Sequence, residues 1–146
     1  MRTWIAGLAA VVLALDQATK WWMLQRLTLG ESLPLLPGIF HLTLVRNPGI
    51  AFGLFAGQGG MVLGLALLLV AVLVVTVKSK PSAWPLPVSW AMGLILGGAL
   101  GNLLDRLRFG AVVDFLDFRV WPVFNLADSA ITIGAALILW AWWRDR

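Results

Sequence analysis

Long apolar runs alternate with short polar segments along the chain. Residues 59–77 contain no charge, residues 88–104 are followed by Asp105, and residues 126–143 are followed by a charged C-terminal end. An α-helix needs about 20 predominantly apolar residues to cross a bilayer. Each of the three runs approaches that length, so the pattern predicts three membrane-spanning helices.

The N-terminal run is interrupted by polar residues. Residues 4–15 are apolar, a polar stretch follows at residues 16–20, and apolar residues then continue the run to position 24. A short apolar run behind Arg2 also fits a cleavable signal peptide. No small-residue cleavage site follows it, however, and the whole run has spanning length. We therefore predict a fourth span over residues 4–24.

The two longest connections between the runs contain strand patterns. Residues 39–46 and residues 112–120 are rich in β-branched and aromatic side chains, which predicts strands. Residues 47–49 read Asn-Pro-Gly, a turn signal, and residues 50–55 fit a short interfacial helix. We expect an all-α membrane protein: a four transmembrane helix bundle with a small extracytoplasmic β-sheet and a short interfacial helix, in one domain over residues 1–146.

The third predicted span also carries glycines at a four-residue spacing. They are Gly93, Gly97 and Gly101. Such a stripe lets another helix approach closely, so we assign these residues to helix packing and not to chemistry.

The composition agrees with a lipid environment. Hydrophobic residues make up 60% of the chain and charged residues 12%, whereas soluble domains carry about 25% charged residues. Four spans place both termini on one side of the membrane. The basic residues of the short segments on that side are Arg2, Lys78, Lys80, Arg144 and Arg146. Because basic segments stay in the cytoplasm, we predict cytoplasmic termini and an extracytoplasmic sheet.

The residue inventory excludes several kinds of site. The chain has no cysteine, which excludes disulfides, thiolate metal sites and a cysteine nucleophile. His41 is the only histidine, which excludes a histidine-rich metal site. We expect no metal and no cofactor. The net charge is +4 and the basic residues are scattered, which favours contact with lipid head groups over a nucleic-acid partner.

Acidic residues concentrate between the third and fourth predicted spans, where Asp105, Asp114, Asp117 and Asp128 lie. Three of them have an ordinary structural explanation. Asp105 can pair with an arginine, and Asp117 can be a solvated strand residue. Asp128 follows Asn125 by three positions, which is the spacing of a capping box at a helix start. Asp114 lies between apolar neighbours, where burial raises the pKa of a carboxyl group and no such role is evident.

Asp114 and Asp128 are therefore candidates for a catalytic pair. Two carboxylates held together in a low-dielectric site share one proton, so one acts as a base on water while the other donates to a carbonyl oxygen. One return of the chain between positions 114 and 128 brings them together at the membrane surface. Asn102 and Asn125 flank the acids and can hold the carboxylates, because buried amides need hydrogen-bond partners.

Other interpretations use the same residues differently. A serine–lysine peptidase would use Ser129 and Lys20, although Asp16 lies four positions before Lys20 and offers that lysine an ion pair. A small transporter or channel subunit would use membrane-embedded acids as a proton relay, but the acids here gather at one end. A purely structural assembly protein would not need two separated aspartates with asparagines beside them.

Four segments together resemble one known family. Residues 16–20, DQATK, resemble the D-Q-x-T-K motif of the lipoprotein signal peptidases (signal peptidase II), and residues 47–53, NPGIAFG, resemble their N-x-G-A-A-F-G motif. Residues 98–115 resemble G-x-x-G-N-x-x-D-R-x-x-x-G-x-V-x-D-F, and residues 124–129 resemble F-N-x-A-D-S. The motifs follow the family's order over most of the chain. Ile50 departs from the pattern, since the family has a small residue there.

This resemblance implies an activity. The family consists of intramembrane aspartyl proteases of the bacterial cell (inner) membrane. They cleave the signal peptide of a diacylglyceryl-modified prolipoprotein just before the lipid-bearing cysteine. The catalytic pair would be Asp114 and Asp128. The supporting polar residues would be Asp16, Lys20, Asn47, Gly49, Asn102, Asp105, Arg106 and Asn125. The implied partners are the prolipoprotein, membrane lipids and globomycin-type cyclic peptide inhibitors, and we expect a monomer.

Overall fold

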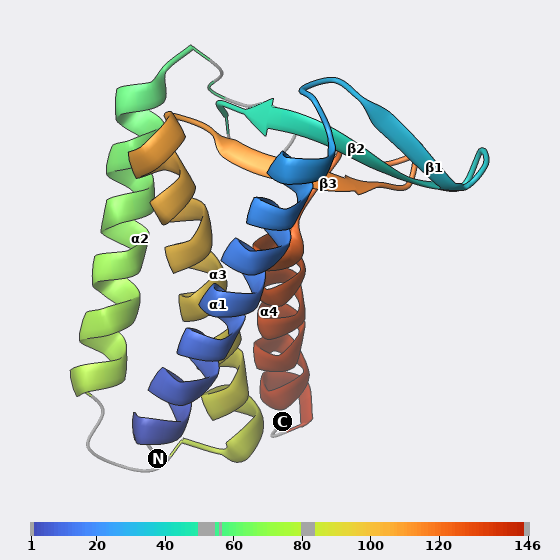
Figure 1. Cartoon of the computed structure of the whole chain (residues 1–146). Helices are drawn as coiled ribbons and strands as arrows, with labels where there is room; N and C mark the ends of the chain where they lie inside the picture. The colour runs from blue at the N-terminus through green and yellow to red at the C-terminus, as the bar shows by residue number, and fades with distance from the viewer. Residues whose placement is uncertain (1, 50–54, 56, 80–83, 145–146) are drawn as a thin grey trace.

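The computed structural model describes residues 2–49, 55, 57–79 and 84–144. Its elements follow one another as α1 (Arg2–Arg26), β1 (Ser32–Leu36), β2 (Phe40–Asn47), α2 (Gly59–Ser79), α3 (Leu86–Phe109), β3 (Val112–Asp117) and α4 (Leu126–Arg144). The helices run side by side as a bundle and the strands cross one end of it (Figure 1). The first turn of α1 and the last turn of α4 lie at the opposite end.

Three of the described helices, α2, α3 and α4, are long and apolar enough to cross a membrane. α1 is also long enough, with 25 residues, but Asp16, Gln17 and Lys20 lower its hydropathy. Two of these side chains are buried in the protein interior, with Asp16 0% and Lys20 2% exposed. The described chain is therefore mostly helical with three candidate membrane spans, and α1 has the length of a span without its composition.

The third predicted span, residues 88–104, is only part of a longer helix. α3 continues through Asp105 and Arg106 and ends where Gly110 takes the left-handed conformation with φ 70°, its N–H donating to the carbonyl of Arg106. The helix extends because Asp105 pairs with Lys20 inside the protein, so its charge does not face lipid.

Glycines let α3 lie close to two neighbours. A Cβ on Gly97 would lie 2.7 Å from the carbonyl oxygen of Ala9 in α1, and a Cβ on Gly98 would lie 2.5 Å from that of Ala127 in α4. Only glycine fits such approaches. A Cβ on Gly93 or Gly101 would likewise meet α1, at Leu8 and Asp16, so the predicted packing role is confirmed for all three glycines of the stripe. Gly98 adds a contact with α4 that the four-residue spacing does not include.

α2 lies at the edge of the bundle and packs against α3. Its buried residues are Val62 and Leu73, whereas Leu68 and Val75 are each 60% exposed. A continuous apolar surface of this kind is unfavourable in water and fits contact with lipid acyl chains.

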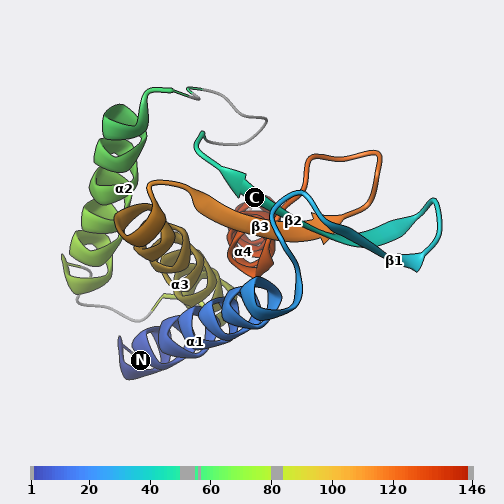
Figure 2. The same cartoon turned by 45° about the horizontal axis from the view of Figure 1, so that its top comes forward.

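The sheet is antiparallel, with strand order β1-β2-β3. It lies across one end of the bundle, and the hairpin of β1 and β2 projects beyond the helices (Figure 2). A small core joins the sheet to the end of α1, where Met23 and Leu27 pack with Leu44, Val113 and Phe115. This core fixes β3 above the helices and so places the residues that β3 carries.

The strands partly follow the prediction. Residues 39–46 are confirmed as a strand with a shift of one residue, but β3 ends at Asp117, short of the predicted end at residue 120, because Arg119 turns the chain with φ 65°. β1 has no alternating pattern, with all its residues exposed, and it forms by pairing with β2. The helix predicted over residues 50–55 lies, apart from Phe55, outside the described residues.

Candidate active site

A cavity of about 800 Å³ lies where the bundle meets the sheet. Asp114 and Asp128 both line it. Its apolar lining includes, from α2 and α4, Val62, Leu65, Ala66, Leu69 and Ile131. The tertiary structure therefore brings the two predicted carboxylates into one space with apolar walls.

Asp114 lies within β3 and is 1% exposed. Its oxygens accept hydrogen bonds from Asn125 Nδ2 at 2.6 Å and from Asn47 Nδ2 at 3.2 Å. Burial, reinforced by the charge of Asp128, raises the pKa of Asp114 to about 7, against the opposing effect of the two amide hydrogen bonds. This carboxyl group is therefore able to carry a proton near neutral pH.

Asp128 is the third residue of α4 and closes the predicted capping box. Its backbone N–H donates to Asn125 Oδ1 at 2.9 Å, and its Oδ2 accepts the backbone N–H of Asn125 at 3.2 Å. Its other oxygen accepts Asn102 Nδ2 at 2.7 Å. Helix capping and a place in the site are thus not alternatives for Asp128, because the same carboxylate caps α4 and accepts the amide of Asn102.

The hydrogen-bond pattern fixes the orientation of both site amides. Asn102 Oδ1 accepts Lys20 Nζ at 3.0 Å, so the amide nitrogen of Asn102 is turned towards Asp128. Asn125 Oδ1 accepts the N–H of Asp128, so its amide nitrogen is turned towards Asp114. Each carboxylate therefore receives a hydrogen bond from one of these two amides, and Lys20 acts on the pair through Asn102.

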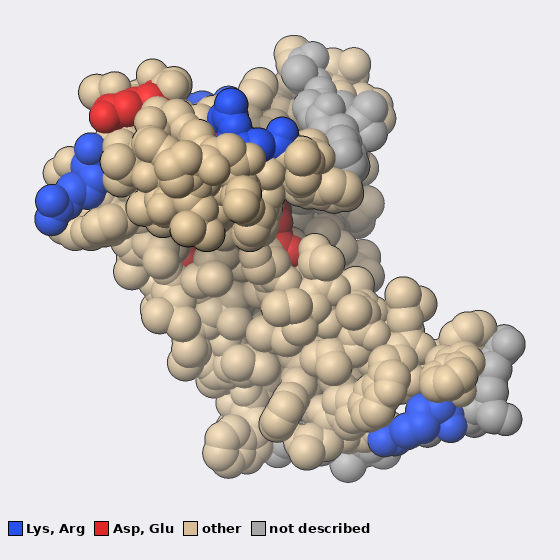
Figure 3. Space-filling view, turned by 90° about the vertical axis from the view of Figure 1, so that its right-hand side faces the viewer, with Lys and Arg blue, Asp and Glu red and all other residues tan. Residues whose placement is uncertain are grey.

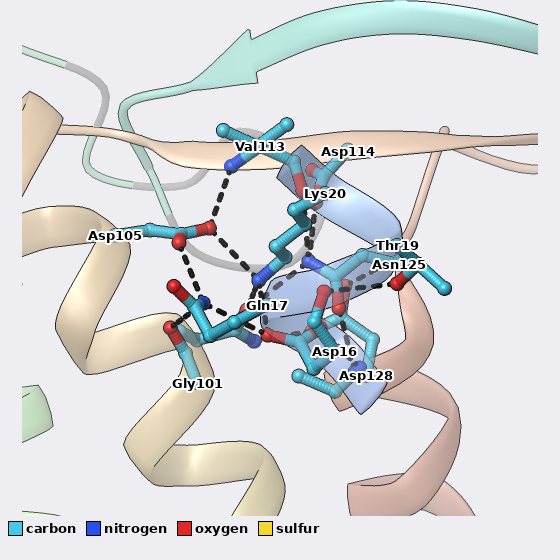
Figure 4. A network of polar contacts seen from close by, with 12 residues as sticks. Asp16, Gln17, Thr19, Lys20, Gly101, Asp105, Val113, Asp114, Asn125 and Asp128 are labelled. Atoms are coloured by element: carbon cyan, nitrogen blue, oxygen red, sulfur yellow. Dashed lines mark hydrogen bonds and ion pairs between the residues drawn. The ribbon is translucent and has the colours of Figure 1, made fainter. Parts of the chain in front are cut away.

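Lys20, Asp16 and Asp105 form a buried ionic network next to the carboxylate pair (Figure 4). Lys20 Nζ lies 2.9 Å from Asp16 Oδ2 and 2.8 Å from Asp105 Oδ2, and none of the three side chains is more than 2% exposed. With Asn102 as its third acceptor, the lysine uses all three of its N–H donors. The predicted ion pair of Asp16 and Lys20 is confirmed, and the partner of Asp105 is this lysine and not an arginine.

The same network ties α1 to other elements. Asp16 Oδ1 accepts the N–H of Ala127 at 2.9 Å, at the start of α4, where helix N–H groups lack internal partners. Asp105 Oδ2 accepts the N–H of Val113 in β3 at 3.0 Å. Gln17 Nε2 donates to Asp105 Oδ1 at 3.0 Å. Gln17 was not among the predicted site residues, although its position inside the polar stretch of the first helix is a signal for it.

Asn47, Gly49 and Arg106 close another side of the site. Asn47 Oδ1 accepts the N–H of Gly49 at 3.0 Å and so turns the chain after β2. Arg106 Nη2 donates to the carbonyl of Gly49 at 2.9 Å, and its Nη1 donates to the carbonyl of Asn102 at 3.2 Å. Arg106 therefore joins α3 to the turn, and it also lines the cavity.

Asp117 belongs to a separate cluster on the sheet, and the prediction of a solvated side chain is wrong, since it is 4% exposed. Thr43 Oγ1 donates to Asp117 Oδ2 at 2.7 Å. Ser32 Oγ lies 2.8 Å from Thr43 Oγ1 and 3.1 Å from His41 Nδ1. Because the proton of Thr43 is used on the carboxylate, Ser32 donates to Thr43 and accepts from His41. A serine hydroxyl that accepts a hydrogen bond from histidine cannot use that histidine as a base, so Ser32 is not an activated nucleophile.

The described residues do not support two other kinds of catalytic site. Ser129 Oγ donates to the carbonyl of Asn125 at 3.0 Å, and the donors of Lys20 are used elsewhere, so no serine–lysine pair forms among them. Nor does this part of the chain hold three or more His, Asp or Glu side chains grouped as they would be around a metal ion.

The distribution of charge on one face agrees with this layout (Figure 3). Basic atoms lie near the sheet and at the opposite end of the bundle, and the helix surface between them is uncharged. Acidic atoms show in a recess beneath the overhanging sheet and at one outer edge. An uncharged band of this kind fits a hydrocarbon layer between two polar surfaces.

Comparison with known proteins gives consistent matches. The model of a family described as signal peptidase (SPase) II matches residues 8–144. The lipoprotein signal peptidase of Pelotomaculum thermopropionicum is 51% identical over 138 residues, covering 93% of this chain and 89% of that protein. That of Moorella thermoacetica is 48% identical over 133 residues, covering 91% and 88%. A solved bacterial membrane enzyme superposes with a TM-score of 0.86 at 34% identity, covering 94% of this chain and 86% of that one.

Proposed function

Because this chain belongs to the signal peptidase II family of lipoprotein signal peptidases, we propose that it is an aspartic endopeptidase. It cuts diacylglyceryl-modified prolipoproteins just before the lipid-bearing cysteine. Family membership makes it a peptidase of prolipoprotein signal peptides, and the aspartate chemistry is the proposal. It is supported by one observation: Asp114 and Asp128 line the same cavity, and each accepts a hydrogen bond from an asparagine amide.

The proposed reaction uses one shared proton. Asp114 holds it, since burial and the charge of Asp128 raise the pKa of Asp114 to about 7, and Asp128 is the base. Asp128 takes a proton from a water molecule whose oxygen attacks the scissile carbonyl carbon, while Asp114 protonates the carbonyl oxygen. When the intermediate collapses, the C–N bond breaks. The leaving amine takes the proton from Asp128, and Asp114 recovers its own.

The supporting residues would hold this pair in place. Asn102 and Asn125 orient the two carboxylates, and Lys20 fixes the orientation of Asn102. Asp16 and Asp105 neutralise the buried lysine. Without this pairing the buried charges would be strongly unfavourable. These residues therefore act on catalysis through geometry and do not touch the scissile bond.

The substrate would reach the cavity from the bilayer. The cavity is lined on one side by α2 and on another by α4, with side chains such as Leu65, Leu69 and Ile131. Acyl chains pack favourably against such walls, while the scissile peptide lies at the carboxylates. A globomycin-type cyclic peptide would inhibit by filling the same space.

We propose four spans in the bacterial cell (inner) membrane, in one domain that works as a monomer without a cofactor. A fourth span is supported by α1, which lies within the bundle beside α3 and α4 and buries the charges of Asp16 and Lys20. Lys78 and Arg144, in the last turns of α2 and α4, lie at the end opposite the sheet, which supports cytoplasmic termini. The active site then faces the extracytoplasmic surface.

Cleavage of a diacylglyceryl-modified prolipoprotein by purified protein in detergent tests the proposed chemistry. Asp114→Asn and Asp128→Asn each keep the shape of the side chain and remove its acid–base function. We expect each to lower kcat about a thousandfold or more, while circular dichroism shows unchanged helix content.

Asp117→Asn is the matched control, because Asp117 lies on the same strand and is also buried but does not line the cavity. It should keep most of the activity, and so should Ser129→Ala. If both Asp114→Asn and Asp128→Asn still cut at the wild-type rate, the aspartic mechanism is wrong. Loss of activity in Ser129→Ala alone would instead favour serine chemistry.

A further inference from the structure

The cavity contains a charged side chain that the proposed chemistry does not use. Arg46, on β2, lines the cavity together with Asp114 and Asp128. Its guanidinium carbon lies 5.1 Å from the ring centre of Phe109, which holds the side chain over the last turn of α3. The ion pairs found within the described chain involve Lys20 and Arg119 and not Arg46. Its planar set of N–H donors is therefore available to a ligand.

Positions along α3 relate Arg46 to the carboxylate pair. Asn102, whose amide donates to Asp128, and Phe109, which carries the guanidinium, are both on this helix. Their separation from position 102 to position 109 corresponds to about 10 Å along the axis, at about 1.5 Å per residue. The guanidinium and the carboxylate pair therefore contact positions about 10 Å apart along α3, with the guanidinium nearer the end of the helix that meets the sheet.

This distance translates into positions on a bound peptide. An extended chain advances about 3.3 Å per residue, so about three residues separate the scissile bond from Arg46. The direction rests on the proposed function. With the sheet on the extracytoplasmic side, the signal peptide comes from the bilayer and the mature chain leaves past the sheet. The residues that meet Arg46 are then those that follow the cut.

We propose that Arg46 is a specificity residue that favours prolipoproteins with an acidic side chain at about the third position after the cut. A guanidinium binds a carboxylate through two parallel N–H···O bonds, and the contact with Phe109 holds it in place for that pairing. A basic side chain at the same position is repelled. Arg106, the other arginine of the cavity, is already engaged by the carbonyls of Gly49 and Asn102.

Two lipid-modified substrates that differ only in Asp or Lys at the third residue after the cut test this inference. The wild type should cleave the Asp substrate with a kcat/KM roughly tenfold higher, mainly through a lower KM. Arg46→Gln should bring the ratio of the two kcat/KM values close to one, and Arg46→Glu should invert it. The inversion cannot come from a merely misfolded variant, because such a variant loses activity on both substrates.

Arg26→Gln is the matched control. Arg26 is also an exposed arginine at the sheet end, held 5.6 Å over the ring of Trp22, but it does not line the cavity. It should keep the ratio of the wild type. Equal cleavage of both substrates by the wild type would overturn the role of Arg46, and so would a ratio that survives Arg46→Gln or disappears in Arg26→Gln. Failure of the wild type to cut either substrate would overturn the proposed function itself.

Discussion

At the scale of single residues, the two carboxylates differ in surroundings and not in chemistry. Asp114 lies on a buried strand, where desolvation favours the neutral acid, whereas Asp128 lies in the first turn of α4, where its carboxylate accepts the N–H of Asn125. In the proposed reaction, this difference in surroundings is what gives Asp114 the role of the acid.

The pH dependence of activity follows from this difference. Since the pKa of Asp114 is raised to about 7, its proton is lost as the pH rises through 7, and kcat/KM should fall above that value. Asn47 donates to Asp114 and so stabilises its ionised form. Asn47→Ala should therefore move this basic limb to higher pH by about 0.5 to 1 pH unit, as measured by initial rates between pH 5 and pH 9.

Thr43→Val provides the comparison for this pH profile, because it removes a hydrogen bond to Asp117 on the same pair of strands but outside the cavity. Its basic limb should coincide with that of the wild type. A limb that stays in place in Asn47→Ala would show that another group controls the loss of activity.

At the scale of elements, the site depends on how closely α3 approaches α1 and α4. α4 carries Asp128, α1 carries Lys20, and α3 carries Asn102, which contacts both. A shift of one helix by a fraction of an ångström would change every one of these hydrogen bonds. The small residues along α3 therefore serve the geometry of the candidate site as well as the packing.

Gly98→Ala tests this dependence. The added Cβ would lie 2.5 Å from the carbonyl oxygen of Ala127, so α4 must move away, and we expect a loss of about 1–3 kcal/mol of stability and a lower kcat. The measurements are thermal unfolding in detergent and cleavage. Gly64→Ala in α2 has open space around it and should be neutral or slightly stabilising. Equal effects of the two substitutions would exclude the packing explanation.

At the scale of the whole molecule, the arrangement separates two surroundings. The apolar faces of α2 and α4 lie between the sheet at one end and Lys78 and Arg144 at the other. The buried ionic network lies near the sheet end, where α1, α3 and α4 meet β3. The proposed orientation puts this end, and with it the cavity, at the extracytoplasmic surface.

The absence of cysteine from the sequence makes this orientation directly measurable. Single cysteines introduced as Ser32→Cys on β1 and Lys78→Cys at the end of α2 occupy exposed positions at opposite ends of the molecule. A membrane-impermeant thiol reagent added to intact spheroplasts should label Ser32→Cys, and should label Lys78→Cys only after lysis. The reverse pattern would place the site on the cytoplasmic side.

The sequence by itself determined the apolar helices and the candidate residues for the proposed chemistry. In lipid, every backbone polar group must be satisfied within a helix or a closed barrel, so an uncharged run such as residues 59–77 has few alternatives to a helix. β2 could also be predicted from local sequence, because its residues are rich in β-branched and aromatic side chains. Asp114 stood out because an acid among apolar neighbours has no simple structural role, and the motif order pointed to Asp128 as its partner.

Only the tertiary structure decided which polar groups meet. Asp105 has Arg106 next to it in the sequence, yet its ion pair is with Lys20 from another helix. Gln17 joins the network through a residue 88 positions away. β1 has no alternating pattern of buried and exposed residues, and it forms a strand by pairing with β2. The local periodicity of a sequence indicates which side of an element is apolar. The partners of buried charges depend instead on distances and hydrogen-bond geometry in three dimensions. These are set only when the helices pack.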